Sequence, residues 1–169
     1  MSEVTNVPSA LSMFAKTDLN GGIFGADSAR NESESRRFNA DLEFGTFAEV
    51  GASGMIAPSA TTTELLGVVM VTNSSSQAQK ALFKQSSGSV GAIGKGGYIV
   101  CLMDATNKPG VDQALSINTN VGKVGYVTGL TAGGVLNVAK AVGKVVQVFD
   151  THCLVELSGD NVIACTYAA

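Results

Sequence analysis

Short apolar stretches separated by Gly, Asn, Asp and Ser recur along the chain from about residue 39 onward. Residues 41–50 alternate acidic and apolar side chains, which is the period-2 pattern of a half-buried β-strand. Residues 65–71 form a continuous apolar run, which predicts a strand buried on both faces. Similar stretches bounded by turn residues predict further strands over residues 97–103, 113–118, 123–128, 145–150, 152–158 and 161–167.

Two stretches, residues 76–85 and 135–142, fit either a short helix or a strand. The glycines on both sides of residues 135–142 favour a β-segment between turns. Many short strands with frequent turn signals are typical of an all-β sandwich or small barrel, and not of βαβ units. We therefore expect a single all-β body.

The first 38 residues differ from the rest because they are rich in Ser, Asn and charged side chains. Such a stretch cannot bury enough apolar area to offset its loss of conformational entropy. We interpret residues 1–38 as an extended polar N-terminal arm that orders only against something else. Residues 39–169 are then the β body.

Composition narrows the function classes. The chain has 169 residues, a net charge of -3 and only 15% charged residues, with a net of -4 over residues 1–50 and +1 over residues 51–169. The mild acidity argues against nucleic acid as a partner, because nucleic-acid binders present a basic face. A nearly uncharged body is a solubility liability for a free protein and suits one that packs against other surfaces.

The N-terminus shows no signal peptide, and no apolar run approaches the roughly 20 residues that span a membrane. We therefore expect synthesis in a host cytoplasm and no membrane partner.

No stretch carries a complete catalytic or nucleotide-binding motif. The glycine-rich residues 88–97 approach a phosphate-binding loop, but the pattern needs Gly in place of Ser89 and a hydroxyl residue in place of Gly96. His152 lies near Asp150 and this pair suits general base chemistry, yet no nucleophile accompanies it. We predict no enzyme activity, no catalytic residue and no cofactor.

The three cysteines, Cys101, Cys153 and Cys165, all lie in apolar, strand-like stretches without a C-x-x-C pair. Free cysteines in such places usually behave as small buried apolar residues, and a disulfide or metal role is the minor alternative. We expect no metal site.

Arg36 and Arg37 form the single pair of adjacent basic residues, between the polar arm and the first predicted strand. Such a pair is either a solvated face or an anchor onto an acidic partner surface, where Arg favours bidentate pairing. We take Arg36, Arg37 and the adjoining Phe38 as the candidate partner-binding residues.

The order of several short segments resembles a known family. These segments are residues 38–51, 66–71, 96–102, 121–127, 145–149 and 154–157. Together they are similar to the head decoration, or structural cement, proteins of tailed bacteriophages, over roughly residues 38 to 158. The chain departs from that pattern in its longer polar lead-in and in a glycine-rich insertion around residues 86–97.

The resemblance implies a small β-tulip or jelly-roll-like domain on the outside of a virion capsid. Such a protein binds the major capsid protein, clamps neighbouring subunits and stabilises the DNA-filled head. Self-association as a homodimer or homotrimer is expected, because the β body has few charges and many strand edges. The alternative is another β-rich phage assembly protein, such as a tail-tube or adhesin-like module.

Overall fold

The computed structural model describes residues 32–71, 79, 82–130, 133–159 and 162–169, and every element that lies wholly within these residues is a β-strand. The strands are β1 (Glu32–Arg37), β2 (Leu42–Glu43), β3 (Phe47–Gly51), β4 (Gly54–Ile56), β5 (Glu64–Leu65), β6 (Gly67–Met70), β7 (Lys84–Gln85), β8 (Val90–Leu102), β9 (Ser116–Asn118), β10 (Val135–Val138), β11 (Gly143–Val148), β12 (His152–Ser158) and β13 (Ile163–Ala168). The all-β prediction is confirmed for this part of the chain.

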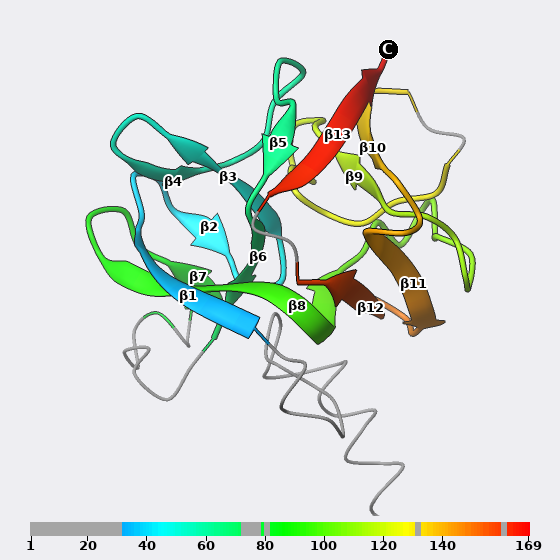
Figure 1. Ribbon diagram of the computed structural model, residues 1–169, viewed down its shortest axis with the longest axis horizontal. Helices are drawn as coiled ribbons and strands as arrows, with labels where there is room; N and C mark the ends of the chain where they lie inside the picture. The colour runs from blue at the N-terminus through cyan, green and yellow to red at the C-terminus, as the bar shows by residue number, and fades with distance from the viewer. Residues whose placement is uncertain (1–31, 72–78, 80–81, 131–132, 160–161) are drawn as a thin grey trace, which may run out of the picture.

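The largest sheet is organised around β8, a strand of 13 residues. Its strand order is β11-β12-β8-β6-β3-β4, with β1 also paired to β8. Strands β1 and β12 pair with different stretches of β8: Arg37 lies opposite Val90 and His152 opposite Leu102. A four-stranded sheet of order β5-β13-β10-β9 lies beside it, and β2 and β7 form a short ribbon (Figure 1).

The arrangement is a sandwich, because none of the sheets closes into a barrel within the described residues. Residues 135–142 fit a helix or a strand on sequence, and their first half, Val135–Val138, forms β10 between β9 and β13, while residues 140–142 form a turn. Of residues 76–85, Gln79 and Leu82 are helical and the last two residues form β7, while residues 76–78 and 80–81 lie outside the described residues.

The main sheet has a hydrophobic core on each of its two faces. The run at residues 65–71 shows this directly, because Val68 belongs to one core and its neighbour Val69 to the other. The first core lies between the main sheet and the four-stranded sheet. The second gathers Phe38, Leu42, Phe44 and Met55 against Val69 and Ile93. The expected burial of β6 on both faces is confirmed, since all four of its residues are buried.

Residues 32–38, which the sequence assigns to the arm, take part in the body. Strand β1 pairs antiparallel with β8, and the side chain of Phe38 is completely buried in the second core. The arm itself stays a prediction, because residues 1–31 lie outside the described residues.

Strands β6 and β8 approach so closely that one position between them excludes a side chain. A Cβ atom placed on Gly67 would lie 2.1 Å from the backbone carbonyl oxygen of Gly94. No real Cβ contact is that short, so the backbones would have to separate. Gly67 therefore allows the pairing that holds β6 against the central strand.

We predict that Gly67→Ala lowers the free energy of unfolding by about 3 kcal/mol or more, because it forces apart two strands that are buried on both faces. Chemical denaturation followed by circular dichroism measures this change. Gly110→Ala is the matched control, since the nearest atom to its added Cβ is 3.8 Å away. Equal stability of the two variants would contradict the argument.

Candidate functional site

Strand β1 presents the predicted basic pair on the surface. The side chains of Arg36 and Arg37 are both exposed, on a strand that lies along the outside of β8 (Figure 1). Phe38 differs from them because it is 0% exposed. Phe38 is a core residue, and its side chain cannot reach a partner while the body is folded. Of the three residues that the sequence grouped together, only Arg36 and Arg37 are therefore accessible to a partner.

Glu34 links β1 to the central strand through a mostly buried ion pair. One carboxylate oxygen accepts a hydrogen bond from Lys95 Nζ at 2.7 Å, and the other accepts one from Arg36 Nε. The Lys95 side chain is only 10% exposed. The hydrogen bond from Lys95, assisted by Arg36 and opposed by partial burial, lowers the pKa of Glu34. The carboxylate therefore stays charged at neutral pH.

The position of Lys95 shows that the glycine-rich residues 88–97 do not form a phosphate-binding loop. The residue lies inside β8, and the register between β1 and β8 shifts at this point, with Glu32 opposite Gly96 and Ser33 opposite Gly94. The bulge directs the lysine to Glu34. A phosphate-binding loop would need these residues before a helix N-terminus, so a nucleotide site is not formed here.

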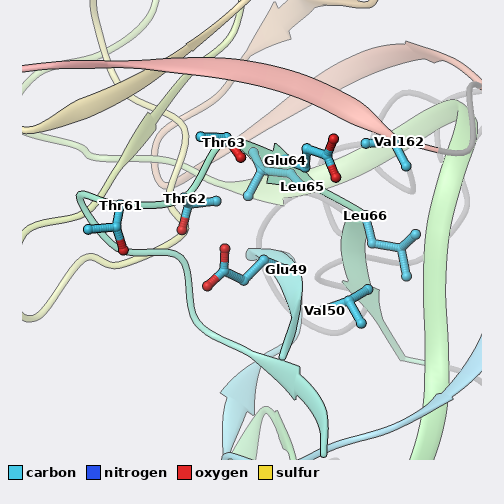
Figure 2. A pocket seen from close by; sticks show the side chains of 9 residues that line it. All are labelled: Glu49, Val50, Thr61, Thr62, Thr63, Glu64, Leu65, Leu66 and Val162. Carbon is cyan, nitrogen blue, oxygen red and sulfur yellow. The ribbon is translucent and has the colours of Figure 1, made fainter. Parts of the chain in front are cut away.

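An open groove of about 210 Å³ lies between β3 and the segment that leads into β5. Its lining combines two carboxylates, Glu49 and Glu64, with hydroxyls of the 61–63 segment and the exposed valines Val50 and Val162. Figure 2 shows Glu49 pointing toward Thr62, while the Glu64 carboxylate turns toward Val162. Such a groove presents negative charge and apolar surface side by side. Sequence reasoning missed it because its residues come from three separate segments.

His152 is not part of an acid–base pair. It is 4% exposed, and its Nδ1 lies 2.6 Å from the hydroxyl oxygen of Thr151. Its Nε2 has no hydrogen-bond partner among the described residues, and Asp150 is exposed. Burial lowers the pKa of His152, so the ring is neutral at pH 7. It acts as a packed core side chain at the start of β12.

All three cysteines are buried free thiols. Burial raises the pKa of Cys101 and of Cys153, and burial together with the nearby carboxylates of Glu49 and Glu64 raises that of Cys165 to about 11. Within the described residues, no group of three or more His, Cys, Asp or Glu side chains is arranged to hold a metal ion. A search of the same residues finds no helix long and apolar enough to cross a membrane.

Comparisons with known proteins agree with this arrangement. A family model described as "Structural cement protein (E217 gp24/Pam3 gp6)" matches residues 17–163. A solved structure titled "The capsid of Myoviridae Phage XM1" contains a similar chain, with a TM-score of 0.69 and 16% sequence identity. The match covers 83% of this chain and 90% of that one, which shows a shared fold. No curated protein matches the chain.

We predict that Lys95→Met lowers the free energy of unfolding by about 2 kcal/mol, because it leaves the Glu34 carboxylate without its buried partner. Amide hydrogen exchange should also become faster in β1. Lys140→Met is the control, since Lys140 pairs with Asp112 at 2.8 Å but both side chains are more than half exposed. If both variants lose the same stability, the Glu34–Lys95 pair does not hold β1.

We predict that stability falls as the pH drops below 6.5, the ordinary pKa of histidine. The folded-state pKa of His152 is lowered, so the unfolded chain takes up a proton first, and the loss ends once the pH reaches the folded-state pKa. Urea unfolding at pH 7.5 and at pH values down to 5.5 measures the slope, which for one proton stays within about 1.4 kcal/mol per pH unit. His152→Leu should remove this slope. A slope that persists in the variant would assign it to other groups.

Proposed function

The chain belongs to the phage structural cement protein family, and from that premise we propose that it binds the outer surface of the major capsid lattice and clamps neighbouring subunits. A structural role in the virion capsid follows from the family itself. The match over residues 17–163 is the observation that carries the proposal, because it includes almost all of the body. The family is described as structural cement, which supports the proposal that the chain is not an enzyme.

The physical properties of the body support this proposal. A clamp has to transmit force between capsid subunits, and a sheet with a packed core on each face is a stiff element. The pairs between its strands are antiparallel throughout. The low charge of residues 51–169 suits a protein that spends its life packed against a lattice.

The proposed partners are the major capsid protein and further copies of the chain, as a homodimer or homotrimer. Nucleic acid and membranes are not among them. Arg36 and Arg37 are exposed on the outer strand, which supports their proposed role as an anchor onto an acidic partner surface. Residues 1–31 are proposed to lie along neighbouring capsid subunits as an extended arm, where binding offsets the loss of chain entropy.

The alternative was a tail-tube or adhesin-like module. The family match favours the cement role over this alternative, because the match is to capsid cement proteins. Binding to capsids separates the two directly. The purified chain is mixed with expanded, undecorated capsids, and saturable binding is measured by cosedimentation. A tail-tube or adhesin module would show none, and that result would refute the proposal.

We predict that removing residues 1–31 weakens capsid binding about tenfold or more, because the arm contributes contacts only when the lattice is present. The deletion has to end before Glu32, since β1 begins there and belongs to the main sheet. The control replaces the arm by a scrambled sequence of equal length and composition. Unchanged affinity of the deletion variant, with an unchanged circular dichroism spectrum, would remove the arm from the mechanism.

A further inference from the structure

Strand β1 lies at an edge of the main sheet. Among the described strands it pairs along its length with β8 alone, and a single bridge joins Phe38 to Met55 of β4 at its end. Its residues Ser33, Ser35, Arg36 and Arg37 are exposed. The stretch from Ser33 to Arg37 therefore presents one strand edge that no other described strand covers.

The direction of the backbone groups along β1 follows from its last contacts. The Phe38 N–H donates to Ser89 O at 2.9 Å, and the Phe38 carbonyl accepts from Gly88 N–H at 2.8 Å, so both groups face the β8 side. Backbone groups alternate along a strand, so those of Glu34 and Arg36 also face β8. Those of Ser33, Ser35 and Arg37 face the open edge.

This alternation limits how two copies of β1 can pair about a two-fold axis, because open-edge residues have to lie opposite one another. A two-fold axis through Ser33 places Glu32 opposite Glu34 of the second copy. One midway between Ser33 and Ser35 places Glu34 opposite itself on the axis, with Glu32 opposite Arg36 toward the strand end. One midway between Ser35 and Arg37 places Arg36 opposite itself, and one through Arg37 places Arg37 opposite itself. Each of these four registers places like charges opposite one another, which is destabilising.

The remaining register has its axis through Ser35. It places Glu34 opposite Arg36 of the second copy, twice by symmetry, and Ser33 opposite Arg37. The two Ser35 side chains meet at the axis. The Glu34 carboxylate already accepts bonds from Lys95 and Arg36, and a carboxylate has about four acceptor positions, which leaves capacity for a second arginine.

We propose that two copies of this chain pair antiparallel through the open edges of β1, with Ser35 opposite Ser35 on a two-fold axis. The inference rests on the self-association included in the proposed function, and it names the surface and the register. Two main sheets would then continue into one another across the dimer. Of the five symmetric registers centred between Ser33 and Arg37, this is the one that places no like charges opposite one another.

A cysteine placed on the axis tests the register in the full-length chain. Ser35→Cys should form a disulfide-linked dimer under mild oxidation, because opposed residues at such a position lie about 5.5 Å apart, within disulfide reach. Ser33→Cys is the matched control, since its two copies would lie more than about 12 Å apart. The native thiols are buried and add little background.

Sedimentation of the unmodified full-length chain at micromolar concentration tests the dimer itself. Ser35→Pro removes an N–H from the open edge without removing one that faces β8, so it should abolish the dimer, whereas Ser35→Thr should keep it. Arg36→Glu opposes four acidic side chains and should weaken the dimer about tenfold or more. Circular dichroism checks that each variant is folded.

A monomeric chain, or cross-linking of Ser33→Cys as efficient as that of Ser35→Cys, would overturn the inference. A dimer that survives Ser35→Pro would also overturn it, because another surface would then hold the copies together. Capsid cosedimentation is measured separately. If the chain is a monomer that binds capsids saturably, the β1 dimer is refuted and the cement role stands. If it forms the β1 dimer but does not bind capsids, the cement role is refuted and the dimer stands.

Discussion

The rest of the structure depends on the pairing of one long strand. Strand β8 carries β1 and β12 on successive stretches of one edge and β6 on the other. Through β6 it also supports β3 and β4, so every strand of the main sheet is joined to it directly or through one of these neighbours. Its glycines keep the neighbouring backbones close, and it supplies both cores, with Ile93 in the second core and Ile99 and Cys101 in the first.

The sequence predicted the all-β class of the fold, but it did not decide whether the sheets stay open as a sandwich or close into a barrel. The burial of residues 65–71 was predicted correctly, because continuous apolar character reports burial locally. Their assignment to one strand was not, since Leu65 ends β5 in the four-stranded sheet and residues 67–70 form β6 in the main sheet. The choice between helix and strand at residues 135–142 was settled by pairing with β9 and β13, which lie far away in the chain. Sandwich and barrel stayed open for the same reason, since closure depends on which distant edges meet and periodicity carries no record of that.

In the candidate site, too, local features could be predicted from the sequence and contacts between distant residues could not. Exposure of Arg36 and Arg37 follows from their charge, and the sequence predicted it. The burial of Phe38 and the contact between Glu34 and Lys95 were not predicted, because the latter joins residues 61 positions apart. A lysine within an apolar strand was the available signal, since a buried cation requires a carboxylate nearby. No comparable signal in the sequence indicated the groove that contains Glu49 and Glu64.

The buried cysteines bear on how long an assembled particle lasts. A virion released from its host has no reductase to reverse oxidative damage, so each exposed thiol would be a site of slow chemical ageing. Oxidants and alkylating agents attack the thiolate, and burial keeps these three sulfur atoms protonated and out of reach. The same arrangement makes the fold independent of disulfide chemistry, so it is complete in a reducing cell and unchanged in an oxidising medium.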